Sequence, residues 1–192
     1  MTPTATSAMY AFFNALNLED SVIDETIPQL KQLQVAPKQV ILRQKEQQKY
    51  GYFIVSGILK ASHYSSNGNE HCKEYYFKDE MCFLYSTWLT NSPANYQIET
   101  LTDADLIKFP LKLLNRAKWL PAKVALLEQQ LLYKEDKEVF LLLKTPEERY
   151  LHLLKYTPQW VASLNNKQLA HYIGISPISL SRIKQRIKVN DT

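Results

Sequence analysis

The sequence predicts an α+β protein with a small antiparallel β-barrel or sandwich in its N-terminal part and helices in its C-terminal part. Short β-like runs separated by turn signals fill residues 35–110. A long apolar stripe at helical spacing follows residue 111, and a pattern of two short capped helices occupies residues 166–185. The length of 192 residues suits one large or two small domains. We predict a division into residues 1–117, 118–144 and 145–192.

The composition is that of a folded protein, with 45% hydrophobic and 22% charged residues, which excludes a disordered chain. No apolar run approaches the roughly 20 residues that a membrane helix needs, and the first 17 residues lack the features of a secretory signal. The only cysteines are Cys72 and Cys82, which favours a reduced compartment over a disulfide scaffold. These observations predict a cytoplasmic protein that has no contact with a membrane.

The N-terminal part begins with apolar residues at three- and four-residue spacing, which predict helix over residues 8–33, broken in two by Pro28. The β-like runs cover residues 40–42, 52–55, 58–61, 75–77, 96–101 and 105–109. Ser56-Gly57 separates two of these runs, and Asn67-Gly68 is a pair favoured in hairpin turns. Strands this short and this regularly spaced are typical of a small barrel or sandwich rather than a parallel sheet.

A long helix is predicted from Pro121, whose missing N–H costs nothing in a first helical turn. Its apolar stripe is formed by Leu120, Val124, Leu127 and Leu131, which step by four, three and four residues. Such a stripe often pairs with its own copy across a two-fold axis. Packing on its own domain is the alternative, and the sequence leaves both open.

Helix-capping residues divide the C-terminal part. Thr145-Pro146 begins a new helix. Asn165 caps a further helix, with glutamine three residues on, and Gly174 supplies the left-handed turn that ends it. Ser176-Pro177 then starts the next helix. Two helices joined by a short turn with glycine form the helix-turn-helix arrangement.

The excess positive charge is concentrated at the C-terminal end. The net charge is +4, and the last thirty residues hold five basic residues and one acidic residue. A basic segment on an otherwise neutral chain indicates contact with a polyanion such as DNA, although a solvated basic tail remains an alternative.

The outward face of the last helix carries the candidate DNA contacts. Arg182 can pair with guanine, Gln185 with adenine, and Ile178 can contact a thymine methyl group. Hydroxyl and cationic side chains on the flanks suit phosphates. The full candidate set is Ser176, Ile178, Ser179, Ser181, Arg182, Gln185, Arg186 and Lys188.

The order of these parts resembles that of the Crp–Fnr transcription regulators. Residues 52–60 (Tyr-Phe-Ile-Val-Ser-Gly-Ile-Leu-Lys) are similar to a strand–turn–strand of their cyclic-nucleotide-binding barrel, and the long helix and helix-turn-helix follow in the same order. The resemblance implies a double-stranded β-helix (jelly-roll-like) sensor barrel, a long dimerisation helix, and a C-terminal helix-turn-helix domain with a short or missing wing. It also implies a bacterial homodimer that binds palindromic double-stranded DNA, with RNA polymerase as a further partner.

The ligand segment departs from the family pattern. Members that bind cyclic AMP hold the phosphate with a Gly-Glu pair and an Arg-Ser or Arg-Ala pair, whereas residues 78–89 here contain neither glycine nor arginine. A carboxylate at Glu80 repels a phosphate, so we expect no cyclic AMP binding in the usual manner. The candidate ligand contacts are Glu80, Tyr85, Ser86 and Thr87. The effector is unknown, and no cofactor or metal site is predicted.

Two other classes of function compete with a regulator. The first is a ligand-binding or protein-interaction barrel whose helix-turn-helix no longer reads DNA. The second is an enzyme on a cupin-like barrel, but His63, Glu70 and His71 lack the close histidine pair that such metal sites use. The four glycines are isolated, so no glycine-rich phosphate loop is present. The sequence therefore predicts a protein that is not an enzyme.

Overall fold

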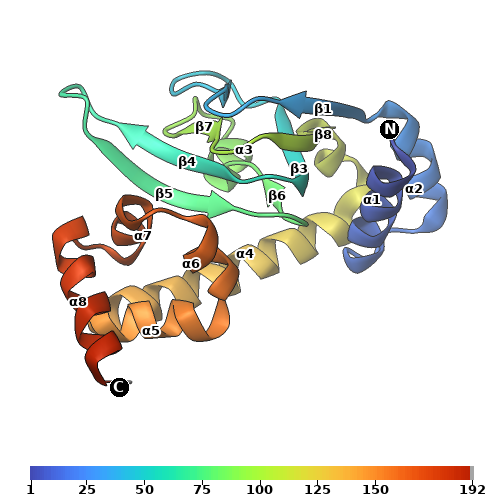
Figure 1. Cartoon of the computed structure of the whole chain (residues 1–192). Helices are drawn as coiled ribbons and strands as arrows, with labels where there is room; N and C mark the ends of the chain where they lie inside the picture. The colour runs from blue at the N-terminus through green and yellow to red at the C-terminus, as the bar shows by residue number, and fades with distance from the viewer. Residues whose placement is uncertain (191–192) are drawn as a thin grey trace. The chain divides into compact units, whose positions relative to one another are not determined.

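The computed structural model describes residues 1–190, with side chains described through residue 187. The chain divides into two compact units, Met1–Glu128 and Gln129–Thr192. The division falls within the long helix α4 (Leu120–Leu143) (Figure 1). Within residues 1–190, no helix combines the length and the hydropathy needed to cross a membrane.

The N-terminal unit contains eight strands in two four-stranded sheets, and every strand pairing is antiparallel. One sheet has the order β1-β8-β3-β6 and the other the order β2-β7-β4-β5. The strands are β1 (Lys31–Val35), β2 (Val40–Leu42), β3 (Tyr50–Ser56), β4 (Leu59–Tyr64), β5 (Glu70–Tyr76), β6 (Met81–Cys82), β7 (Gln97–Thr100) and β8 (Ala104–Pro110). The predicted jelly-roll-like fold is confirmed, but the two sheets remain separate and do not close into a barrel.

Helical segments flank these sheets. They are α1 (Pro3–Ala15), α2 (Asp20–Thr26), η1 (Ile27–Gln29), α3 (Tyr85–Thr90), η2 (Leu111–Asn115) and η3 (Ala117–Trp119). The prediction of helix over residues 8–33 is wrong at both ends. Helix begins at Pro3, where Thr2 accepts a capping hydrogen bond, and residues 31–35 form β1 along β8. In β1, glutamine alternates with apolar residues, and pairing with a distant strand outweighs the local helical spacing.

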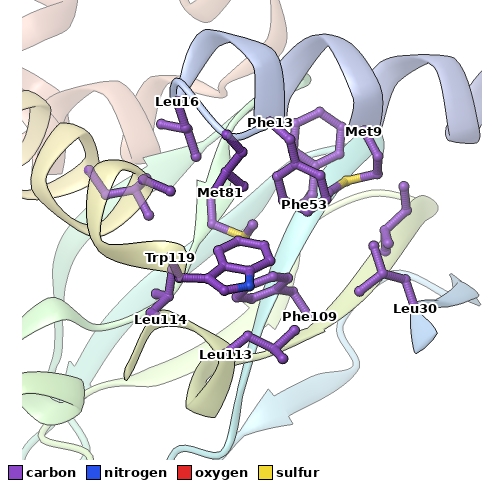
Figure 2. Packing of buried hydrophobic residues seen from close by; sticks show 14 of the residues in the cluster. Met9, Phe13, Leu16, Leu30, Phe53, Met81, Phe109, Leu113, Leu114 and Trp119 are labelled. Atoms are coloured by element: carbon purple, nitrogen blue, oxygen red, sulfur yellow. The ribbon is translucent and has the colours of Figure 1, made fainter. Parts of the chain in front are cut away.

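A large apolar core lies between the N-terminal helices and the first sheet. Phe13 of α1 meets Trp119 edge to face, with ring centroids 5.3 Å apart, and Phe109 of β8 packs against the same indole. Figure 2 shows Leu113 and Leu114 of η2 beneath this aromatic group. Phe13, Phe109 and Trp119 are each no more than 1% exposed.

The turn between β3 and β4 depends on Gly57. Its φ is +96°, and an added Cβ would lie 2.5 Å from the carbonyl oxygen of Asp103. Both the left-handed backbone and the close approach require glycine at this position.

The C-terminal unit consists of the second half of α4 and four further helices. These are α5 (Pro146–Tyr156), α6 (Pro158–Ser163), α7 (Asn166–Ile173) and α8 (Pro177–Asn190). Helix α5 packs on α6 and α7, and α7 packs on α8. The apolar side chains buried in this unit are Phe140, Tyr150, Leu153, Leu164, Leu169, Ala170, Ile173, Leu180 and Ile183.

Candidate nucleic-acid interface

Helices α7 and α8 form the predicted pair, and their caps are confirmed. The Asn165 side chain accepts from the N–H of Gln168 at 2.9 Å, and the Gln168 side chain accepts from the N–H of Asn165 at 2.8 Å. Gly174 ends α7 with φ +78°, in the left-handed region. The Ser176 hydroxyl accepts from the N–H of Ser179 at 3.1 Å and so caps α8. Local sequence signals therefore define this turn and both helix ends.

A side-chain contact ties the two helices together. Asn166, in the first turn of α7, donates to the carbonyl oxygen of Pro177 at 2.9 Å. The same amide donates to the Ser181 hydroxyl at 3.1 Å, and that hydroxyl donates to the carbonyl oxygen of Pro177 at 3.0 Å. These bonds join the start of α7 to the first turns of α8. Leu180 and Ile183 lie on the buried side, so the opposite side of α8 faces solvent.

Six of the eight predicted DNA contacts are exposed residues of α8, and a seventh, Ser176, is the exposed residue that caps it. Ile178 is 66% exposed, which is unusual for a large apolar side chain and leaves it available to a ligand. The guanidinium of Arg182 and the amide of Gln185 are exposed, and within the described part of the chain neither has a recorded hydrogen bond or ion pair. The side chain of Lys188 lies outside the described residues.

The serine hydroxyls on this face form hydrogen bonds within the protein. Ser176 and Ser179 share a 2.9 Å hydrogen bond between their hydroxyl oxygens, and Ser181 binds within the α7–α8 contact described above. Each remains exposed. A hydroxyl oxygen has two lone pairs and one proton, so these groups retain the capacity for one further bond.

A groove of about 630 Å³ separates the start of α5 from α8. Arg182 and Arg186 line it from α8, and Thr145 and Glu147 line it from the start of α5. One guanidinium nitrogen of Arg186 lies 2.8 Å from a Glu147 carboxylate oxygen. Arg186 is therefore held by an acidic side chain of α5, whereas no ion pair of Arg182 is recorded among the described residues.

Arg149 of α5 holds three helix ends together and was not anticipated from the sequence. It donates through Nε to the carbonyl oxygen of Lys144 at 3.0 Å and through Nη1 to that of Ile173 at 2.7 Å. Nη2 donates to the carbonyl oxygen of Leu141. These acceptors belong to the ends of α4 and α7, where helix carbonyls lack partners and the helix dipole favours a cation. Arg149 thus positions α7, and through it α8.

The four predicted ligand contacts differ in their burial and in their neighbours. Tyr85 stacks on Phe83, with ring centroids 4.1 Å apart, beside the apolar core around α1. Thr87 is 3% exposed and Ser86 is exposed, so they lie at different depths in α3. A carboxylate oxygen of Glu80 accepts from the N–H of Phe77 at 3.0 Å.

The chemistry around Glu80 is unsuited to an anion. Burial raises the pKa of Glu80 to about 7, the negative charge of Glu74 adds to this rise, and the hydrogen bond from Phe77 opposes it. The space between the two sheets is filled by an apolar cluster that includes Tyr52 and Tyr76. A half-buried carboxyl disfavours an anion beside it, and packed tyrosines supply no positive charge.

The stripe predicted on α4 is largely exposed. Leu120, Val124 and Leu131 are 59%, 43% and 61% exposed, and Leu127 is half-buried. These side chains lie one above another on α4 because they repeat at three- and four-residue intervals.

Comparison with known proteins agrees with this architecture. Residues 32–117 match the family model described as the cyclic nucleotide-binding domain. FixK2 from Bradyrhizobium japonicum has a TM-score of 0.70 and 17% identity, covering 84% of this chain and 86% of that one. The chain has the Crp–Fnr fold. None of the curated proteins matches the sequence.

Two further solved structures share the Crp–Fnr fold over most of their length. The c-di-GMP responsive global regulator CLP from Xanthomonas campestris has a TM-score of 0.67 and 15% identity, covering 90% of this chain and 93% of that one. The Catabolite Activator Protein from Thermus thermophilus has a TM-score of 0.52 and 18% identity, covering 92% and 88%. The resemblance inferred from residues 52–60 and the helix-turn-helix is therefore confirmed as one of fold.

Metal-ligand side chains do not gather in the part of the chain that the structure describes. No group of three His, Cys, Asp or Glu residues is placed to hold a metal ion in residues 1–190. Cys72 and Cys82 are free thiols, and burial raises the pKa of both. A thiol with a raised pKa is a poor nucleophile and a poor metal ligand at neutral pH.

Proposed function

We propose that this chain is a sequence-specific DNA-binding transcription regulator of the Crp–Fnr type that binds palindromic operators as a homodimer. The observation that carries the proposal is the exposed face of α8, where Arg182 and Gln185 stand without partners among the described residues beside exposed Ile178. Arginine and glutamine are the side chains that pair bidentately with guanine and adenine in the major groove. In this proposal the chain acts in the cytoplasm, is not an enzyme, and responds to an effector other than cyclic AMP.

The exposed stripe on α4 supports the homodimer. Exposed leucine and valine side chains are unfavourable in water, and the free energy falls when a second helix covers them. Two copies of α4 packed across a two-fold axis would give the dimer two α8 helices related by that axis. Half-sites about 34 Å apart, one turn of DNA, follow from that symmetry. RNA polymerase is a proposed further partner.

The test of DNA binding begins with selection of duplexes from a random library, followed by mobility-shift titration of the selected duplex. We expect Arg182→Ala to weaken binding roughly 10- to 100-fold and to relax the preference at one base pair in each half-site. Lys155→Ala is the matched control, since it removes one exposed cation of α5 outside the α8 face. Equal losses in both variants, or unchanged binding in Arg182→Ala, would refute base recognition by Arg182.

The dimer is tested separately by sedimentation. Leu131→Lys places a charge in the exposed stripe and is expected to convert the dimer to a monomer at micromolar concentration. Glu128→Lys, at an exposed α4 position outside the stripe, is the control for the added charge. A monomeric wild-type protein would overturn the proposed assembly.

The alternative function, a protein-interaction module with an inactive helix-turn-helix, makes a different salt prediction. Each phosphate neutralised by a cation contributes about −0.9 to the slope of log K against log salt concentration. An apolar protein interface has no such slope. A steep slope that Arg186→Ala, at a candidate phosphate contact, reduces by about one therefore supports the DNA regulator.

A further inference from the structure

A second concave site lies in the N-terminal unit and is independent of the DNA proposal. It has a volume of about 680 Å³ and is formed by the start of β3, the end of α3, η2 and the first turns of α4. Its chemically distinctive lining residues are Lys49, Tyr50, Trp88, Lys112 and Lys123. We call the site that these five residues line the basic pocket. Its volume is in the range of sites that hold ligands of nucleotide size, about 300–1,000 Å³.

The charge of the basic pocket is of one sign. Three lysines line it, and none of its lining residues is aspartate or glutamate. Lys49 and Lys112 are exposed, Lys123 is half-buried, and within the described residues none of the three has a recorded ion pair. Like charges gathered in a concavity raise the local concentration of anions, and an anion with several charges neutralises the mutual repulsion of the lysines.

The aromatic side chains give the basic pocket a second recognition element. The Nζ of Lys108 lies 3.8 Å from the Tyr50 ring centroid, and the Nζ of Lys123 lies 5.3 Å from the Trp88 ring centroid. The Tyr50 side chain remains 37% exposed and Trp88 is half-buried. Aromatic rings that are partly exposed beside cations offer a flat surface on which another ring can stack while its charged groups reach the lysines.

We propose that the basic pocket binds a small polyanion that carries a planar ring, of the nucleoside di- or triphosphate class. The lysines bind the phosphates, and Tyr50 or Trp88 stacks on the ring. The residues that line this site are different from Glu80 and from the tyrosines packed between the two sheets. The ligand is predicted to bind without a covalent step.

The experiment is calorimetric titration of the full chain with guanosine triphosphate as the probe, alongside guanosine and pyrophosphate. We expect the triphosphate to bind at least about tenfold more tightly than either fragment, because each fragment satisfies only one of the two elements. Equal affinity for guanosine would overturn the role of the lysines. Equal affinity for pyrophosphate would overturn the role of the rings, and no binding of the triphosphate would overturn the whole proposal.

Substitution assigns the binding to this pocket. Lys49→Ala and Lys112→Ala change exposed side chains and are each expected to weaken triphosphate binding about tenfold. Lys78→Ala removes an exposed lysine outside the pocket and is the matched control. The triphosphate should change the tryptophan fluorescence of the wild type through Trp88, and Trp88→Phe should abolish this change. Unchanged affinity in both pocket variants, or an equal loss in Lys78→Ala, would refute the assignment. Thermal unfolding of every variant confirms that the fold is retained.

Discussion

Replacing Arg149 tests whether one side chain holds α5 and α7 in place. Arg149→Met keeps the apolar stem and removes the hydrogen bonds to Leu141, Lys144 and Ile173. Hydrogen bonds from a charged donor contribute about 1.5–3 kcal/mol each when buried, but Arg149 is only half-buried and water can replace part of them. We therefore expect a loss of about 2–4 kcal/mol. That is a large share of the roughly 3–10 kcal/mol expected for a unit of this size.

Hydrogen exchange measured by mass spectrometry locates the effect of Arg149→Met. A loss of 2–4 kcal/mol corresponds to roughly 30- to 700-fold faster exchange of amides in α5 and α7. Amides in β3 and β4 should exchange as in the wild type, because they belong to the other compact unit. Arg149→Lys should be intermediate, since an ammonium keeps the charge but not the planar fork. Unchanged amide exchange in α7 of Arg149→Met would contradict this role of Arg149. An equally large effect of Arg186→Met, which alters an exposed arginine, would contradict it as well.

Three further changes probe other parts of the molecule. Gly57→Ala should lower the free energy of unfolding of the N-terminal unit, measured in urea, by about 2–4 kcal/mol. Gly68→Ala is the control, because its added Cβ meets no atom within 4 Å, and it should cost only the backbone strain of about 1–2 kcal/mol. Glu80 keeps its proton up to about pH 7 in the folded chain, whereas the unfolded chain releases it near pH 4.5. The free energy of unfolding of the wild type should therefore fall by roughly 2–3 kcal/mol as the pH rises through this window, and Glu80→Gln should remove that fall. A fall of the same size in the variant would disprove the role of this carboxyl. Glu147→Gln releases Arg186 and removes an acidic group of α5 from the groove beside α8, so the selected duplex should bind about two- to fivefold more tightly in a mobility shift. Weaker binding would show that the carboxylate supports the interface.

The parts of the structure that depend on neighbouring residues could be predicted from the sequence. Asn165 and Gly174 act within one helical turn of their own positions, and the ends of α7 and α8 follow from them. The exposed and buried faces of α8 follow from the helical repeat once its start is known. The same local reasoning identified Arg182 as a candidate DNA contact.

The parts that depend on distant contacts could not be predicted in this way. Strand β1 forms because β8, more than seventy residues later, pairs with it, as in the register of Lys31 with Lys108. Arg149 binds carbonyl groups at both Leu141 and Ile173, and a backbone carbonyl leaves no mark in the sequence. The basic pocket collects side chains from four separate segments, so the spacing of its lysines along the chain gives no signal.

Methylation interference tests whether the exposed face of α8 enters the major groove of DNA. Methylation at guanine N7 blocks the major groove, whereas methylation at adenine N3 blocks the minor groove. We expect interference at guanine N7 in two half-sites about one helical turn apart, and we expect Arg182→Ala to lose that interference. Interference confined to adenine N3, or a guanine pattern that Arg182→Ala leaves unchanged, would contradict it.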